Sequence, residues 1–204
     1  MKQEQQQVKI FTADPSALGL FGLAMVTFVA SSQKLGWTDG TSLVIPWAIF
    51  LGAFAQLFAC IHDAKKGNTF GTTAFGGYAF FWFAVAMSWM IQQGVFGETL
   101  AAGADKSQLG FAFLGYLIFT LFMTLGAMET NKVLYAIFVC IDFLFLGLTF
   151  DSFGIASDVM HRVAAVAELC IALLSFYASA AAVLNAHFER TFLPIGKPFR
   201  VFKK

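Results

Sequence analysis

Long hydrophobic runs separated by short polar stretches dominate this sequence. Six of these runs approach or reach the roughly 20 residues that an α-helix needs to cross a lipid bilayer. They cover residues 16–33, 42–61, 72–91, 109–128, 132–150 and 162–184. The pattern predicts an all-α integral membrane protein with six transmembrane helices joined by short loops.

Composition excludes a soluble globular domain. Hydrophobic residues make up 58% of the 204 residues and charged residues 12%, and the mean hydropathy is +0.72, values typical of a membrane protein. Residues 1–13 are expected to form a polar cytoplasmic tail, residues 14–190 the six-helix domain, and residues 191–204 a basic tail on the anionic inner leaflet. The polar start lacks the apolar core of a signal peptide, so the first helix is expected to be retained.

The positions of lysine and arginine predict the orientation of the helices. Ten of the thirteen fall on one side of the predicted membrane, namely Lys2, Lys9, Lys65, Lys66, Lys132, Arg190, Lys197, Arg200, Lys203 and Lys204. The other side carries Lys34, which we expect to reach the lipid headgroups, Lys106 and Arg162. Because cytoplasmic loops are rich in basic residues, both termini are predicted to be cytoplasmic, in a multi-pass protein of the plasma membrane. Topology accounts for the basic residues, so no nucleic-acid partner is predicted.

A helix-entrance motif marks the start of the first span. Asp14 can cap the first free N–H groups, and Pro15 fits the first helical position because its missing donor is not needed there. Gly19 and Gly22 leave bare backbone that allows another helix or a small ligand to come close. The positive end of the helix dipole favours an anion at such a place. A capped, glycine-packed helix start without a ligand explains the same residues.

A second helix start on the same side repeats this pattern. Asn68 and Thr69 follow the basic pair Lys65 and Lys66, and glycines and hydroxyls occupy the first turns. Two positive dipole ends beside two lysines would attract a small anion. Tyr78 lies about two turns further, where its ring would narrow a path and its hydroxyl would meet a solute; a core tyrosine bonded to a neighbouring helix is the alternative.

Several polar side chains lie inside the hydrophobic spans. Asp142 sits near the middle of the fifth run, where an ionisable group is costly, usually faces the bundle interior, and is able to stay protonated. Glu168 is a second acid in the sixth run, and Ser175 follows on its helical stripe as a pore wall would. The two acids are candidate proton-coupling groups, or else polar bonds between helices. Gln56 either bonds across helices or lines a pore.

Signatures of enzymes are missing from the sequence. There is no phosphate-binding glycine loop, no HExxH and no GxSxG motif, so no enzyme and no catalytic residues are predicted. The histidines are dispersed and the cysteines fall inside apolar spans: His62, His161, His187, Cys60, Cys140 and Cys170. They indicate neither a zinc site nor disulfides, and no metal or cofactor is expected.

Taken together, several motifs carry a family resemblance. Residues 14–20 resemble the Asn-Pro-Ala-Pro-Leu-Gly-Leu signature of the acetate uptake transporter family, which includes the succinate–acetate permeases. Further matching segments lie at residues 65–71, 73–75, 78, 119–123, 183–185 and 190–196. These motifs keep their order from the first helix to the C-terminal tail, so the resemblance covers nearly the whole chain.

The resemblance implies six helices per subunit, each subunit with its own pathway, in a homo-hexamer. It implies passage of acetate, and in some members succinate, by a channel-like or proton-linked route. An apolar constriction is expected at Leu23, Tyr78 and Ile141, and acetate contacts are expected near Leu18, Gly19, Phe75 and Tyr78.

This chain departs from the family signature at Asp14, Ser16 and Ala17, which stand where asparagine, alanine and proline are usual. Asp142, directly after Ile141, is a charge that the family pattern does not lead us to expect. It would carry a proton with acetate, or indicate a different solute. The alternatives are therefore a channel for a small neutral solute such as urea and a membrane sensor or scaffold that transports nothing, with a membrane enzyme third.

Overall fold

The computed structural model describes residues 13–202, so the predicted basic residues Lys2, Lys9, Lys203 and Lys204 and most of the N-terminal tail lie outside it. Nine helical segments make up this part of the chain, and no strand occurs between residues 13 and 202. They are α1 (Ser16–Lys34), α2 (Val44–Trp47), η1 (Ala48–Ala55), α3 (Gln56–Lys65), α4 (Thr69–Gln92), α5 (Glu98–Ala102), α6 (Lys106–Ala127), α7 (Lys132–Ser152) and α8 (Ser157–His187).

The segments form six helices that are long and apolar enough to cross a membrane, as predicted, with α2, η1 and α3 joined into one span over Val44–Lys65. The bounds differ from the sequence pattern mainly where a helix continues past the hydrophobic run. The last span begins five residues earlier than expected, at Ser157, and ends at His187 rather than at residue 184. Hydropathy marks only the part of a helix that lies in hydrocarbon, so polar helical ends are missed.

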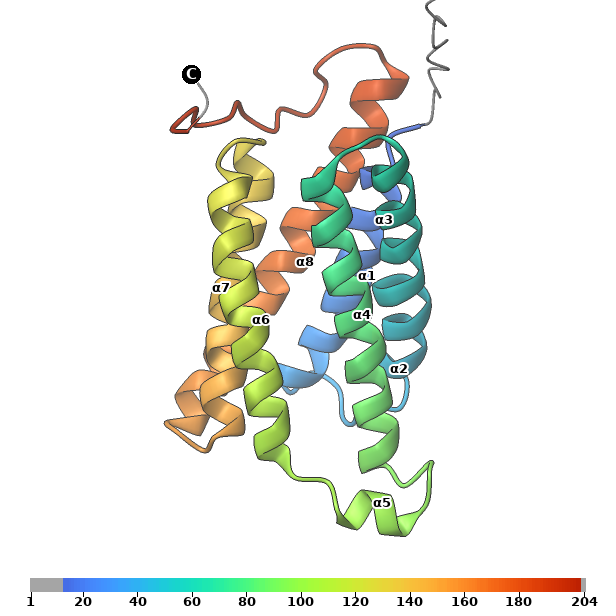
Figure 1. Cartoon of the computed structure of the whole chain (residues 1–204), viewed down its shortest axis with the longest axis vertical. Coiled ribbons are helices and arrows are strands. Elements are labelled where there is room, and N and C mark those ends of the chain that lie inside the picture. Colours follow the sequence, from blue (N-terminus) through green and yellow to red (C-terminus); the bar gives the residue numbers. More distant parts are fainter. Residues whose placement is uncertain (1–12, 203–204) are drawn as a thin grey trace, which may run out of the picture.

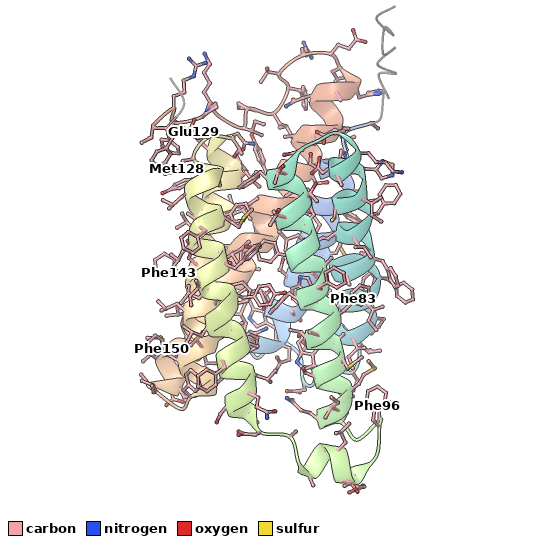
Figure 2. The ribbon with its side chains drawn as sticks, in the orientation of Figure 1. Phe83, Phe96, Met128, Glu129, Phe143 and Phe150 are labelled. Atoms are coloured by element: carbon pink, nitrogen blue, oxygen red, sulfur yellow. The ribbon has the colours of Figure 1, made fainter. Side chains whose placement is uncertain are left out.

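The helices stand side by side in one bundle (Figure 1). The described chain begins and ends at the same end of the bundle, which also carries the α3–α4 and α6–α7 connections and is called the terminal face below. The closest neighbours are α1 with α8, α7 with α8 and α6, and α3 with α4. Phenylalanines such as Phe96, Phe143 and Phe150 are exposed and point outward (Figure 2), an arrangement suited to contact with lipid tails.

The second span contains a π-helix, η1, whose turns are wider than those of an α-helix. The carbonyl oxygen of Leu51 in this segment lies against the bare backbone of Gly22, where any Cβ atom would clash with it. Gly52 similarly faces the ring of Trp82, whose Cγ would be 2.8 Å from an added Cβ. Both glycines therefore serve close packing of the second span against its neighbours.

The C-terminal strap, residues 188–202, crosses the terminal face from α8 to the α6–α7 turn (Figure 1). Asn185 binds its near part, accepting hydrogen bonds from the backbone N–H groups of residues 192 and 193 and donating to the carbonyl of residue 193. Glu129 holds its far part by accepting from the backbone N–H groups of residues 201 and 202. The predicted basic tail thus lies across the end of the bundle, whereas the sequence suggested the lipid surface.

Candidate functional site

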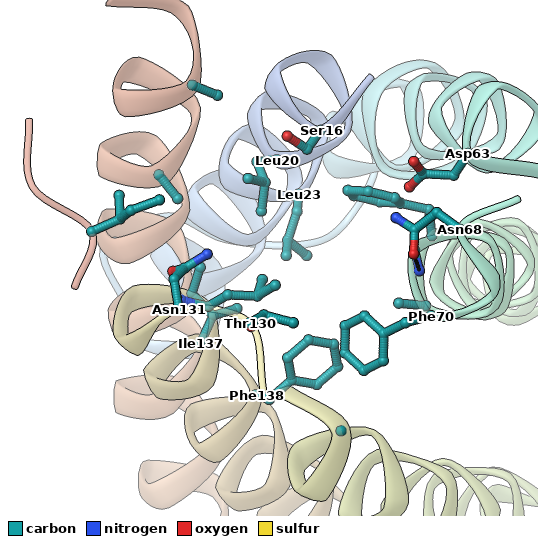
Figure 3. A pocket seen from close by; sticks show the side chains of 18 of the residues that line it. Ser16, Leu20, Leu23, Asp63, Asn68, Phe70, Thr130, Asn131, Ile137 and Phe138 are labelled. Carbon is teal, nitrogen blue, oxygen red and sulfur yellow. Dashed lines mark hydrogen bonds between the residues drawn. The ribbon is translucent and has the colours of Figure 1, made fainter. Parts of the chain in front are cut away.

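A cavity of about 860 Å³ lies between the helices and reaches the terminal face. Its wall is built from α1, α3, α4, α6, α7, α8 and the strap. In Figure 3, Leu20 and Leu23 of α1 face Phe70 and Phe138 across this space. The cavity therefore lies between the helices of one chain and opens at the terminal face.

The rim of the cavity carries acidic side chains, and backbone N–H groups of the chain bind two of them. Asp14, Asp63 and Glu129 contribute carboxyl groups to the lining, and among the described residues no lysine or arginine lines the cavity. The backbone N–H of Ser16 donates to Oδ1 of Asp14 (3.0 Å), and Glu129 is held by the strap. Lys66, predicted to attract an anion here, instead donates its Nζ to the carbonyl oxygen of residue 13 at 2.7 Å.

The starts of the other two helices at this face are also capped by the chain itself. Oδ1 of Asn68 accepts from the N–H of Gly71 at 3.1 Å at the start of α4. Oδ1 of Asn131 accepts from the N–H of Leu134 at 2.9 Å at the start of α7. Side-chain capping leaves fewer free N–H groups at the positive helix ends than the sequence suggested, so these ends have less to offer an anion.

The floor of the cavity is apolar and tightly packed. Leu23, Tyr78 and Ile141, the three residues expected at a constriction, are all buried and meet here, together with Phe75. The Tyr78 ring packs against the rings of Tyr116, Phe119, Phe138 and Phe145. The ring of Tyr78 is thus fixed by an aromatic cluster beside the cavity.

Hydrogen bonds also fix the hydroxyl group of Tyr78. It lies 3.0 Å from Oγ1 of Thr120, and Thr120 donates its only hydroxyl hydrogen to the carbonyl oxygen of Tyr116 at 2.7 Å. Tyr78 must therefore be the donor in its bond to Thr120. The hydroxyl of Tyr78 ties α4 to α6, which is the alternative that the sequence left open.

Gln56 brings a polar group to this wall. Its Nε2 donates to the carbonyl oxygen of Gly52 at 2.8 Å, within the same span. Its Oε1 is buried and has no hydrogen-bond partner among the described residues. A buried acceptor without a partner is unfavourable, so Gln56 is a costly polar group beside the apolar cavity wall.

The remaining predicted site residues lie elsewhere. Leu18 is 42% exposed on the outside of α1, and Gly19 is packed under Phe75, whose Cδ1 would lie 2.9 Å from an added Cβ. Pro15 and Thr69 stand at the helix starts outside the cavity lining, and Ser175 is buried in α8 with its hydroxyl unpartnered among the described residues.

Neither of the two intramembrane acids lines the cavity. Asp142 lies between α7 and α6, where its Oδ2 accepts a hydrogen bond from Thr124 at 2.8 Å. Glu168 is almost fully buried and forms an ion pair with Lys34, whose Nζ is 2.9 Å from its Oε2. Lys34 therefore turns into the bundle, and the expectation that it reaches the headgroups was wrong.

The chain is similar in sequence and in structure to known membrane proteins. The model of the GPR1/FUN34/yaaH family matches residues 2–196. The succinate-acetate/proton symporter SatP of Escherichia coli (strain K12) is 34% identical over 187 residues, which are 91% of this chain and 96% of that protein. Acetate permease A of Emericella nidulans is 28% identical over 197 residues, 90% of this chain and 65% of that protein. A solved structure of the bacterial acetate channel SatP aligns with a TM-score of 0.84 and 30% identity, covering 91% of this chain and 100% of that one.

Proposed function

This chain belongs to the GPR1/FUN34/yaaH family, as its motifs predicted, and we propose that it carries acetate and similar small monocarboxylates across the plasma membrane together with a proton. It is a multi-pass membrane protein of a family of acetate channels and transporters, and it is not an enzyme. The acidic rim and the apolar floor of the cavity are the observation that supports co-transport of a proton.

The electrostatics of the cavity favour the neutral acid over the anion. An acetate ion that enters it approaches three carboxyl groups and then an apolar floor, and burying an unpaired charge costs several kcal/mol or more. Acetic acid has no net charge, so its entry leaves no unpaired charge in the cavity. The carboxylate and a proton would then cross the floor together.

The proposed pathway runs from the cavity past Leu23, Tyr78 and Ile141, with Phe75 in its wall. Leu18 and Gly19 are left outside it because one is exposed on the outer surface and the other is covered by a phenylalanine ring. We place the terminal face in the cytoplasm, since it carries most of the basic residues, and we expect a homo-hexamer with one pathway per subunit.

Flux measurements in proteoliposomes test the proposal. Uptake of labelled acetate is compared with and without an inward proton gradient, against protein-free liposomes that report diffusion through the lipid. We expect protein-dependent uptake that a proton gradient accelerates and that collapsing the gradient slows. Equal uptake in the two kinds of liposome at every pH would refute transport and favour a sensor or scaffold.

A small neutral solute such as urea is the second candidate. The absence of lysine and arginine from the cavity lining, among the described residues, suits an uncharged solute as well as it suits a protonated acid. Labelled urea in the same liposomes separates the two functions. Urea flux above the protein-free background, with no acetate flux, would replace the first proposal.

A further inference from the structure

We propose that the Lys34–Glu168 pair, at the end of the bundle opposite the cavity, is a second carboxylate site, where an incoming anion replaces Glu168 on Lys34 while Glu168 takes up a proton. This inference rests on the proposed transport of a monocarboxylate. It names the group that carries the proton and the cation that first holds the anion.

The two partners are buried and come from different helices. Lys34 is the last residue of α1 and Glu168 lies within α8, with 13% and 2% of their side chains exposed. Lysine and glutamate are rarely buried unless they are paired. Lys34 is therefore a cation held inside the bundle, unlike the lysines at the terminal face.

The pair lies on the helix faces that line the cavity, several turns beyond its floor. On α1 these residues recur every three or four positions, as Leu20, Leu23, Thr27, Ser31 and Lys34, and the first two line the cavity. Eleven residues of helix separate Leu23 from Lys34, a rise of about 16 Å. The path of α1 thus leads from the cavity floor to the pair.

Residues on one face of α8 also lead from the cavity to the pair. This stripe runs through Ala182 and Ala178, which line the cavity, and continues through Ser175 and Ile171 to Glu168. Between cavity and pair, the hydroxyl of Ser175 is buried without a partner among the described residues. The stripe thus places a buried polar atom between the cavity and the pair.

Two partly exposed ionisable residues, His161 and Asp151, lie near the pair at its end of the bundle. Nε2 of His161 lies 3.2 Å from the backbone carbonyl oxygen of Lys34, and its Nδ1 lies 3.1 Å from Oδ2 of Asp151. The side chains of His161 and Asp151 are 43% and 26% exposed. The ionisable groups around Glu168 are thus Lys34 from α1 and His161 from α8, with Asp151 from α7 bonded to the histidine.

Charge balance decides how an anion is able to enter. The resting pair is neutral, so an anion that joins it leaves one unpaired negative charge in a buried place, which is strongly unfavourable. If Glu168 gains one proton at the same time, Lys34 pairs with the anion and the site stays neutral. Return of that proton from Glu168 to the carboxylate releases neutral acid toward the cavity and restores the Lys34–Glu168 pair. One proton thus accompanies each monocarboxylate.

Isothermal titration of purified protein with acetate tests the proposal independently of transport. Titration in buffers with different ionisation enthalpies gives the number of protons taken up per acetate bound. We expect about one proton for the unmodified protein. Lys34→Gln/Glu168→Gln, which removes both charges and leaves no unpaired ion, should bring this number close to zero and weaken acetate binding at least about tenfold, the loss of one charge-assisted contact.

Asp142→Asn is the matched control, because it also removes a carboxyl group inside the membrane but lies away from the pair, beside Thr124. It should keep both the proton count and the affinity. Unchanged proton uptake and affinity in the double variant would show that the pair is only structural, and absence of acetate-linked proton uptake in the unmodified protein would equally overturn the inference. Acetate flux that persists in liposomes in either case would leave the proposed function standing.

Discussion

Replacing Tyr78 with phenylalanine should lower stability slightly and leave transport intact. The change removes a buried hydroxyl whose hydrogen is already donated to Thr120, 3.0 Å away, and keeps the ring that packs at the cavity floor. One neutral hydrogen bond contributes about 0.5–1.5 kcal/mol, so the melting temperature should fall by roughly 1–6 °C. Acetate flux should stay within about twofold, since the hydroxyl is not free to bind the solute.

Thermal unfolding in detergent and acetate flux in liposomes measure the two effects, with Thr120→Val as the matched variant that breaks the same bond from the other side. Because both variants remove the same Tyr78–Thr120 bond, the destabilisation of the double variant should be smaller than the sum of the single values. A tenfold loss of flux in Tyr78→Phe with an unchanged melting temperature would refute this reasoning and assign the hydroxyl to the solute.

Three further changes test other parts of the structure. Gly22→Ala places a Cβ against the carbonyl of Leu51 and should destabilise the protein by about 1–3 kcal/mol, which the yield of folded protein and its melting temperature would show; an unaffected protein would contradict the close packing. Leu23→Ala widens the cavity floor and should raise the flux of butyrate relative to acetate, whereas an unchanged ratio would place the narrow point elsewhere. Asn185→Ala removes three hydrogen bonds to the strap and should speed tryptic cleavage after Arg200, so equal cleavage rates would argue against this anchor.

The helices could be predicted from the sequence because runs of apolar residues are long and clear, but their inward faces could not. In a membrane span, lipid-facing and interior positions are both apolar, so periodicity carries little information about orientation. Leu18 and Leu20 illustrate this: the first is 42% exposed and the second 7% exposed, although the residues are chemically identical. Leu18, where we expected an acetate contact, therefore lies on the outer face of α1 and does not line the cavity.

Pairings between distant residues were also hidden from the sequence. Lys34 and Glu168 are 134 positions apart, and each alone fitted a simpler role at a helix end or within a pore. Leu23, Tyr78 and Ile141, which the family resemblance grouped, line one cavity, and spacing alone had not connected them. Their role as a constriction stays a prediction. The π-helix of the second span could not be predicted either. Its residues are uniformly apolar, and the change to i→i+5 backbone hydrogen bonds does not alter the hydropathy of the sequence.

The C-terminal strap has a practical consequence for handling the protein. Phe202, in the far part of the strap, forms part of the cavity wall. An affinity tag or fluorescent fusion attached downstream of the strap would pull on the contacts that Glu129 makes with residues 201 and 202, beside the cavity. Kinetic work is therefore best done after such a tag has been cleaved, so that turnover reflects the protein and not an attached obstacle.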